Sequence, residues 1–288
     1  MAIKCIGILT SGGDAPGMNA AIRAVTRTAI YNGYQVKGIM RGYHGLVTNE
    51  IVDFKSQSVS NIIQKGGTIL KTARSKEFRT PEGRQQAYEN MKAHGIDALV
   101  VIGGDGSLSG AQIFANEFDI PIVGLPGTID NDIGCCDYTI GYDTAMNTIM
   151  QMVDRIRDTA ESHDRCAVVE VMGRGAGYLA LNAGVACGAT STLIPEVPYD
   201  FDRDVIERMK RTQKTDKKHF IIIVAEGVSE KIGGVANLAK IIEEKTGVES
   251  RATVLGHVQR GGCPTCKDRL VASQMGYRAV ELLDEGIG

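Results

Sequence analysis

The chain has 288 residues, of which 43% are hydrophobic and 23% charged, which is enough for one large or two medium domains with a substantial core. Its 32 basic and 34 acidic residues nearly balance, which excludes the strong positive field of a general nucleic-acid or membrane-lipid binder, so any anion site must be local. The N-terminus lacks the apolar core of a secretory signal, and the longest central apolar run, residues 220–225, has only the length of a strand; this favours a cytoplasmic protein.

The first half of the chain alternates apolar strand-like runs with amphipathic segments. Residues 5–9 predict a strand, and residues 18–32 predict a helix. The expected apolar face of this helix consists of Ala21, Ile22, Val25 and Ala29. A buried strand over 98–102 precedes a helix over 109–118, and 121–125 predicts a third strand.

The second half repeats the alternation. Residues 143–160 predict a long helix that bridges two lobes, and we interpret its apolar residues as core rather than cofactor contacts: Met146, Ile149, Met150, Val153 and Ile156. Strands over 165–172 and 220–225 and helices over 235–246 and 268–285 follow. Without repeats or a low-complexity linker, the pattern predicts an α/β fold of two lobes, each a largely parallel sheet covered by helices.

Two glycine-rich acidic turns follow predicted strands, SGGDAPG at 11–17 and GGDGS at 103–107. Such turns expose backbone N–H groups to an anion at the carboxyl ends of strands, where open α/β sheets bind ligands, and neither contains the lysine of a P-loop. Asp105 is suited to hold the Mg²⁺ of a nucleotide. The alternative is a solvated turn aspartate, because Asp-Gly favours turns.

The segment PGTIDNDI at 126–133 supplies a second acidic motif. In an extended segment, Thr128, Asp130 and Asp132 point to one side, so both carboxylates would face one cavity. An aspartate placed there can remove the proton of an attacking sugar hydroxyl. Taken alone, the sequence also suits a loop or a helix cap.

Two later motifs supply basic residues: MGRGAGYLA at 172–180 contains Arg174, and RATVLGHVQRGG at 251–262 contains Arg251, His257 and Arg260. Arg165 precedes a predicted strand. Each arginine singly is typical of a solvated surface, whereas guanidinium groups gathered at strand ends indicate a phosphate pocket.

Seven cysteines are scattered along the chain, and we expect reduced thiols. The pair Cys263 and Cys266 has C-x-x-C spacing, but no second pair or histidines at ligand spacing accompany it, so a zinc or redox site is the less favoured interpretation.

Seven motifs in register make the chain resemble the bacterial 6-phosphofructokinase family over essentially its whole length. They are SGGDAPGMNAAIR, GGTIL with TARSKEFR, ALVVIGGDGS, GLPGTIDNDI, DYTIGYDTA, VVEVMGRGAGYLA and RATVLGHVQRGG. The resemblance implies transfer of the ATP γ-phosphoryl group to the 1-hydroxyl of fructose 6-phosphate, with Mg²⁺, in a homotetramer that binds neither nucleic acid nor membrane. It also implies an ATP and Mg²⁺ lobe over 1–140 and 257–288, and a sugar lobe over 141–256.

The resemblance assigns roles position by position. Asp130 matches the general base, Thr128 a catalytic neighbour, and Arg74 and Arg174 the arginines that stabilise developing charge. The positions that match the nucleotide and metal side are Gly13, Tyr43, Arg74, Ser75, Gly104, Asp105, Gly106, Ser107 and Gly110. The positions that match sugar-phosphate contacts are Thr128, Ile129, Asp130, Asp132, Arg165, Met172, Gly173, Arg174, Glu226, Arg251, His257, Val258, Gln259 and Arg260. Arg165 and Arg251 match arginines supplied by a neighbouring subunit.

Two positions bear on the phosphoryl donor. The pyrophosphate-dependent branch typically has aspartate and lysine where this chain has Gly106 and Gly127, and the small residues leave room for the α-phosphate of ATP. A pyrophosphate-dependent enzyme, another kinase with a GGDGS-type turn and a noncatalytic nucleotide-binding regulator are the alternatives.

The departures from the family concern regulation and length. Arg23, Arg27, Arg157, Lys217 and Lys218 match the effector pocket for ADP and phosphoenolpyruvate. Charged effector residues are replaced at Ser56, Asn61, Thr190 and Thr215, which predicts weak or altered effector control. Family members usually continue beyond residue 288, so we expect a C-terminus shortened relative to the family.

Overall fold

The computed structural model describes residues 3–288 and divides into two compact units. Unit 1 comprises the described residues up to Thr128 together with Ile133–Thr144 and Arg260–Gly288. Unit 2 comprises Ile129–Asp132 and Ala145–Gln259.

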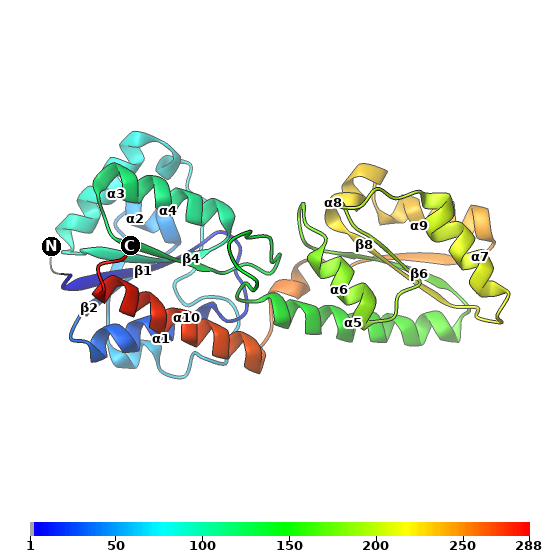
Figure 1. The fold of residues 1–288 in the computed structure, drawn as a ribbon, viewed down its shortest axis with the longest axis horizontal. Helices are drawn as coiled ribbons and strands as arrows, with labels where there is room; N and C mark the ends of the chain where they lie inside the picture. The colour runs from blue at the N-terminus through cyan, green and yellow to red at the C-terminus, as the bar shows by residue number, and fades with distance from the viewer. Residues whose placement is uncertain (1–2) are drawn as a thin grey trace. The chain divides into compact units, whose positions relative to one another are not determined.

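Unit 1 is built on a five-stranded sheet with the order β3-β2-β1-β4-β5 (Figure 1). The strands are β1 (Cys5–Ser11), β2 (Gln35–Ile39), β3 (Ile51–Phe54), β4 (Ala98–Gly103) and β5 (Ile122–Pro126). All neighbours pair in parallel except β3, which is antiparallel to β2. Because β1 lies between β2 and β4, the chain changes direction across the sheet at β1 and β4, and such a switch point is where open α/β sheets bind ligands.

Helices cover both faces of this sheet, which is why β1 and β4 are buried along their whole length and are mostly apolar. On one face lie α1 (Met18–Tyr31) and α10 (Cys266–Asp284), and on the other α2 (Gly42–Val47), α3 (Pro81–Ala93) and α4 (Asp105–Phe118) (Figure 1). The 3-10 turns η1 (Ser56–Val59) and η2 (Glu77–Arg79) lie in the connections. The predicted apolar face of α1 is confirmed: Ala21, Ile22, Val25 and Ala29 are all buried.

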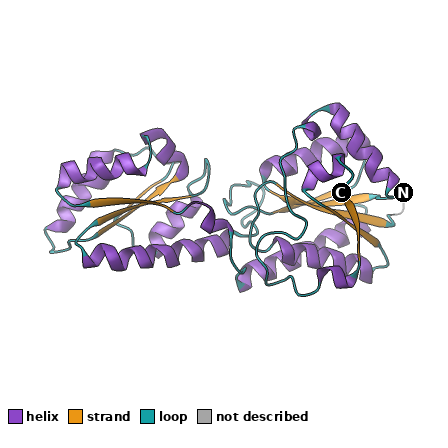
Figure 2. Cartoon of the chain, turned by 180° about the vertical axis from the view of Figure 1, so that it is seen from behind, coloured by secondary structure: helices purple, strands orange, loops and turns teal. Residues whose placement is uncertain are grey.

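Unit 2 has a four-stranded, wholly parallel sheet of order β7-β8-β6-β9. Its strands are β6 (Cys166–Val171), β7 (Ser191–Leu193), β8 (Phe220–Ala225) and β9 (Ser250–Val254). Figure 2 shows helices on both sides of this sheet as well. The helical segments are α5 (Tyr142–Ser162), α6 (Tyr178–Ala186), η3 (Asp202–Glu207), α7 (Arg208–Gln213), α8 (Glu226–Ser229), η4 (Glu230–Ile232), α9 (Val235–Thr246) and η5 (Gly256–Arg260).

The long helix α5 begins in unit 1 and continues in unit 2 from Ala145. Of its predicted core residues, Ile149 and Val153 are fully buried, whereas Met146, Met150 and Ile156 are half-buried. The interpretation of the methionines as core therefore holds only in part.

The predicted α/β class with two helix-covered, largely parallel sheets is confirmed. One predicted boundary is wrong: α4 begins at Asp105, not at residue 109. The last three residues of GGDGS therefore lie in the first turn of the helix rather than in a separate loop, while Gly103 ends β4 and Gly104 is the N-cap. None of the helices within residues 3–288 is long and apolar enough to cross a lipid bilayer.

Candidate active site

The two glycine-rich turns lie side by side at the switch point of unit 1. Ser11, the last residue of β1, pairs with Gly103, the last residue of β4. Gly12 has a φ of 87°, in the left-handed region that favours glycine, and a Cβ on Gly103 would lie 2.6 Å from the Ser11 carbonyl oxygen. The glycines therefore let the two backbones approach closely, and the turns form one cradle for an anion.

The cradle ends at the amino terminus of α4. Gly104 occupies the N-cap, and the exposed Asp105 lies in the first helical turn. The positive end of this 14-residue helix attracts phosphate, and a carboxylate beside it attracts a cation.

A magnesium ion that arrives with a nucleotide fits this arrangement. Within residues 3–288, no group of three or more His, Cys, Asp or Glu side chains is placed to hold a metal ion by itself. Mg²⁺ is commonly held by one or two carboxylates together with substrate phosphates and water, and Asp105 beside the phosphate cradle meets that requirement.

An aromatic wall borders the cradle. The Tyr43 hydroxyl donates to the Ser107 carbonyl oxygen at 2.7 Å, and the Tyr43 ring stacks on Phe78 with ring centroids 4.0 Å apart. A Cβ on Gly110 would stand 3.5 Å from the Tyr43 ring. Burial raises the pKa of Tyr43, so its hydroxyl stays protonated and keeps this donor role.

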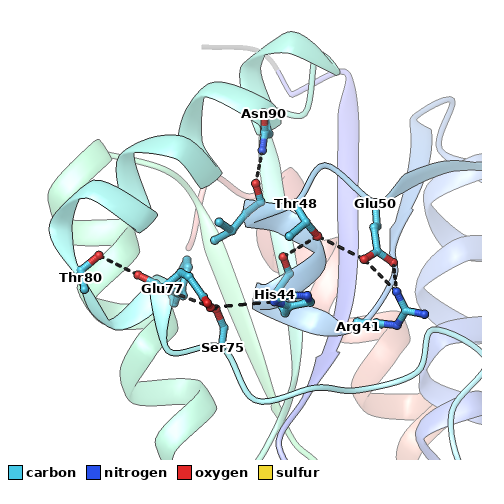
Figure 3. A network of polar contacts seen from close by, with 10 residues as sticks. Arg41, His44, Thr48, Glu50, Ser75, Glu77, Thr80 and Asn90 are labelled. Carbon is cyan, nitrogen blue, oxygen red and sulfur yellow. Dashed lines mark hydrogen bonds and ion pairs between the residues drawn. The ribbon is translucent and has the colours of Figure 1, made fainter.

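A polar network holds the segment that carries Tyr43 (Figure 3). Arg41 at the start of α2 donates to both carboxylate oxygens of Glu50, at 2.9 and 2.7 Å, and these hydrogen bonds lower the pKa of Glu50. Thr48 bonds the His44 carbonyl oxygen, and Asn90 of α3 donates to the Leu46 carbonyl oxygen at 2.9 Å. Because α2 is bonded at both ends, the position of Tyr43 is fixed.

The segment that carries Arg74 and Ser75 is tied to the first turn. Thr72 donates to the Gly12 carbonyl oxygen at 2.7 Å, and Ser75 accepts from the Phe78 backbone at 3.1 Å. The side chain of Arg74 is exposed, as an arginine that meets a phosphate from solution must be. Unit 1 thus contains Gly13, Tyr43, Asp105 and the segment with Arg74 and Ser75, which are far apart in the sequence.

The PGTIDNDI segment departs from the extended geometry expected for it. Thr128 and Asp130 are buried, with 7% and 8% exposure, whereas Asp132 is exposed. The reason is Asn131, whose φ of 53° places it in the left-handed region and breaks the alternation of a strand. The expectation that Asp130 and Asp132 point to one side is therefore wrong.

In unit 2, the residues predicted to bind the sugar follow three adjacent strands. The Met172 backbone, after β6, donates to the Gln259 side chain at 3.1 Å, and the Arg174 backbone donates to Glu226, after β8, at 2.9 Å. His257 and Val258, after β9, are exposed. These carboxyl ends form one polar edge of the sheet.

Gln259 has a narrower role than expected. Its side chain is completely buried and bonds the backbone at both ends, because it also donates to the Gly256 carbonyl oxygen at 3.0 Å. It therefore holds the loops after β6 and β9 together. Gly173, with a φ of 141°, lies in the loop after β6 and adopts a backbone conformation that favours glycine.

Arg165 and Arg251 lie at the other end of these strands. Arg165 precedes β6 and its Nε lies 2.9 Å from a carboxylate oxygen of Glu249, to which Arg251 also bonds. This ion pairing lowers the pKa of Glu249. Unit 2 of one chain therefore does not bring these two arginines to Met172 and His257.

Sequence and structure comparisons identify the family. The sequence model described as Phosphofructokinase matches residues 5–283. The chain belongs to the phosphofructokinase family. It is 63% identical over 284 residues to ATP-dependent 6-phosphofructokinase 2 of Bacteroides thetaiotaomicron, which covers 98% of this chain and 86% of that protein. It is 57% identical to ATP-dependent 6-phosphofructokinase of a Thermoanaerobacter species, covering 98% and 87% of the two chains.

Solved structures of other family members agree with this fold. The phosphofructokinase from Saccharomyces cerevisiae has a TM-score of 0.93 and 43% identity over 98% of this chain, which spans 42% of the yeast chain. The pyrophosphate-dependent phosphofructokinase from Marinobacter aquaeolei has a TM-score of 0.87 at 24% identity, covering 99% of this chain and 77% of that one, and shows the fold alone.

The residues that match the family's effector pocket are divided between the units. Arg23 and Arg27 lie on α1 in unit 1. Arg157 on α5 bonds the Cys187 carbonyl oxygen in unit 2, where Lys217 and Lys218 precede β8. Among the described residues, neither unit contains the whole set.

The seven cysteines differ in exposure. Cys135, Cys263 and Cys266 are exposed, Cys136 is half-buried, and Cys5, Cys166 and Cys187 are buried. The chain from Cys263 to the start of α10 at Cys266 forms no turn, and Thr265 is extended with a ψ of 166°. Both cysteines of this C-x-x-C are free in the structure.

One residue of the site region escaped prediction. Asp268 looks like an ordinary helix-surface residue in the sequence, yet it is completely buried in unit 1. The sequence does contain one indication that Asp268 lies at a helix start, because Thr265 and Asp268 have the spacing of a capping box. In the structure, the Thr265 hydroxyl caps α10 by accepting a hydrogen bond from the Asp268 backbone at 3.3 Å.

Proposed function

We propose that this chain transfers the γ-phosphoryl group of ATP to the 1-hydroxyl of D-fructose 6-phosphate, giving fructose 1,6-bisphosphate and ADP. The observation that carries the proposal is the meeting of SGGDAPG, GGDGS and PGT at the adjacent carboxyl ends of β1, β4 and β5. Its support is a relative of 63% identity named ATP-dependent 6-phosphofructokinase 2.

On the donor side, the backbone of Gly13 and Gly104 and the helix end at Asp105 would receive the ATP phosphates. Mg²⁺ held by Asp105 neutralises phosphate charge when bound. Tyr43, Ser75, Gly106, Ser107 and Gly110 would line the nucleotide. Arg74 would stabilise the charge that develops on the transferring group.

On the acceptor side, Asp130 accepts the proton of the 1-hydroxyl as that oxygen attacks the γ-phosphorus, and the bond from phosphorus to the ADP oxygen breaks. Its burial removes competing water and strengthens its interaction with the hydroxyl. Arg174 offsets charge on the phosphoryl group. The remaining proposed sugar contacts are Thr128, Ile129, Asp132, Met172, Gly173, Glu226, His257, Val258, Arg260 and the backbone of Gln259.

ATP is favoured over pyrophosphate by the two small residues. A Cβ on Gly106 would meet nothing within 4 Å, so the space beside Asp105 is open to a larger donor. A Cβ on Gly127 would lie 3.0 Å from Ile102, so a lysine there would have to displace a core side chain.

The assembly and setting form part of the proposal. We propose a homotetramer in which Arg165 and Arg251 complete the sugar phosphate site of a neighbouring subunit, because they lie away from Met172 and His257 in their own unit. Unit 1 would be the ATP and Mg²⁺ lobe and unit 2 the sugar lobe. A cytoplasmic location and an effector pocket formed by Arg23, Arg27, Arg157, Lys217 and Lys218 belong to the same proposal.

The test is ADP release in a coupled assay with fructose 6-phosphate, comparing the parent with Asp130→Asn. We expect the variant to lose several orders of magnitude in kcat, because general-base catalysis and hydroxyl orientation both depend on this carboxylate. Asp119→Asn is the matched control: Asp119 is exposed with a φ of 53°, which asparagine also adopts. Parental activity in Asp130→Asn would refute the proposed base.

A further inference from the structure

Asp268 is a fully buried carboxylate of unit 1 that accepts several hydrogen bonds and that the proposed chemistry does not use. Its side chain, at 0% exposure, accepts hydrogen bonds from the Tyr138 hydroxyl at 2.6 Å, from the Gly141 and Thr144 backbones at 2.8 Å each, and from the Thr144 hydroxyl. A buried carboxylate is costly unless its oxygens are satisfied. All four donors belong to one short segment, residues 138–144.

The start of α10 also donates hydrogen bonds to this segment. The Thr265 backbone donates to the Thr144 hydroxyl at 3.0 Å, and the Thr265 hydroxyl donates to Asp143 at 2.7 Å. The Lys267 ammonium lies 4.5 Å from the centre of the Tyr138 ring. The segment is therefore fixed by the helix rather than by its own turn alone.

The other side of the segment contacts the strand end that leads to Asp130. The Thr139 hydroxyl donates to the Thr128 carbonyl oxygen at 2.6 Å, and the Ile140 backbone donates to the Pro126 carbonyl oxygen at 2.8 Å. Ile140 also forms a β-bridge with Gly127. Any shift of residues 138–144 thus moves Thr128, which lies two residues before Asp130 in the chain.

The same segment packs against the first glycine-rich turn. A Cβ on Gly141 would lie 2.7 Å from the Ala15 Cβ, and a Cβ on Gly17 would lie 2.7 Å from Ile140 and 3.5 Å from Asp268 itself. The neighbouring side chains therefore leave no room for a Cβ at either glycine. Residues 138–144 therefore contact both the SGGDAPG turn and the PGT strand end. Asp268 holds residues 138–144 in place through its hydrogen bonds.

We propose that Asp268 is a positioning residue for phosphoryl transfer, which acts through residues 138–144 to hold the SGGDAPG turn and the PGT strand end in one geometry. The role rests on the proposed kinase function. A misplacement of about 1 Å in such a site can cost about 100-fold in rate, so the defect belongs in kcat rather than in nucleotide binding.

The test uses Asp268→Asn in the full chain, which keeps the side-chain shape and turns one acceptor into a donor. We expect kcat with ATP and fructose 6-phosphate to fall by about 10- to 100-fold, while the KM for ATP changes by less than about threefold. Amide hydrogen exchange should rise in residues 138–144, 126–128 and 11–17. Asp268→Glu should recover part of kcat, and adding Tyr138→Phe to Asp268→Asn should cost no more than Asp268→Asn alone.

Leu283→Ala is the control for mere destabilisation. Leu283 is buried in the last turn of the same helix, far along it from Asp268, so this variant should unfold at a lower temperature while keeping kcat at 20 °C within about twofold of the parent. The inference is overturned if Asp268→Asn keeps parental kcat, or if Leu283→Ala shows the same loss of kcat. If the parent chain releases no ADP with fructose 6-phosphate, the proposed function is refuted instead. Even then, the positioning role is overturned by itself if amide hydrogen exchange in residues 11–17 and 126–128 of Asp268→Asn equals that of the parent.

Discussion

The guanidinium group of Arg260 lies against Gly13, with its Nη1 2.7 Å from the point where a Cβ on Gly13 would stand. The same nitrogen donates to the Asp14 carbonyl oxygen at 3.4 Å. Arg260 begins the C-terminal part of unit 1, and 246 residues separate it from Asp14. The proposed ligand of the sugar phosphate is thus placed by the turn that would receive the donor phosphate.

Gly13→Ala should therefore impair both halves of the reaction. The added methyl group displaces the Arg260 guanidinium and narrows the approach to the backbone of the first turn. We expect kcat to fall by about 10- to 100-fold and the KM for fructose 6-phosphate to rise, because a hydrogen bond to a charged group contributes about 1.5–3 kcal/mol. Steady-state kinetics provide the measurement. Gly134→Ala, where a Cβ meets nothing within 4 Å, is the matched control, and equal behaviour of the two variants would contradict the account.

The donor preference can be tested at Gly106. Gly106→Asp places a second carboxylate beside Asp105 without a steric clash, so we expect the fold to persist and kcat/KM for ATP to fall by about 100-fold, because like charges repel the α-phosphate. Gly106→Ala adds only a methyl group inside α4 and should raise stability by up to about 1 kcal/mol while retaining ATP turnover. Rates with ATP and with pyrophosphate, together with the unfolding midpoint, decide between these outcomes. Unchanged ATP kinetics in Gly106→Asp would argue against a nucleotide at this position.

Sharing of sites between subunits predicts complementation. Arg165→Ala should raise the KM for fructose 6-phosphate by about 10- to 100-fold, since it removes a charged hydrogen bond to phosphate. At a fructose 6-phosphate concentration well below the raised KM of Arg165→Ala, each variant alone should be nearly inactive. After subunit exchange, a mixture of Arg165→Ala with Asp130→Asn should be more active than either variant at that concentration, because hybrid assemblies contain sites with both native residues. A mixture that exchanges subunits and stays inactive contradicts shared sites, as does a dilute monomer with full activity.

The buried thiol of Cys166 predicts a loss of stability at alkaline pH. Burial raises its pKa from 9.0 to about 12 in the folded chain. Above pH 9 the unfolded chain loses this proton first, so the contribution to stability is complete below pH 9 and declines as the pH rises toward 12. The decline is at most about 1.4 kcal/mol per pH unit. Between pH 8 and pH 10, the denaturant midpoint of unfolding should therefore fall more in the parent than in Cys166→Ala. An equal fall in the two proteins would contradict the raised pKa of Cys166.

Effector control should be weak or altered. The resemblance to the family implies that Thr190 stands in place of a carboxylate that could hold the Mg²⁺ of ADP, and that Ser56, Asn61 and Thr215 stand in place of other charged groups. We therefore expect weaker electrostatic binding of an effector phosphate. We expect ADP and phosphoenolpyruvate to change activity by less than about threefold at subsaturating fructose 6-phosphate, which corresponds to a small coupling free energy. Strong activation by ADP together with strong inhibition by phosphoenolpyruvate would contradict this.

The sequence predicted the local parts of this structure well, because they depend on local patterns. The period of apolar residues locates β1, α1, β4 and α9, and glycine-rich turns after buried strands locate the anion cradle. The exposure of Asp132 was not predictable from spacing, because a single left-handed residue, Asn131, redirects the chain.

Long-range contacts account for the remaining differences. The burial of Asp268 depends on donors 124 to 130 residues away, and the contact of Arg260 with the first turn spans nearly the whole chain. Neither has a periodic pattern in the sequence. The start of α4 at Asp105 was missed because Gly-Asp-Gly reads as a turn, although Gly104 extends the chain into the N-cap position.

The most direct test of the proposed activity is phosphorus NMR of the reaction of the full chain with ATP, Mg²⁺ and fructose 6-phosphate. We predict a new phosphate ester at carbon 1 of the sugar, formed in equal amount to ADP, and no comparable product when pyrophosphate replaces ATP. Release of ADP without a sugar bisphosphate, or product only with pyrophosphate, would contradict the proposal that this chain is an ATP-dependent 6-phosphofructokinase.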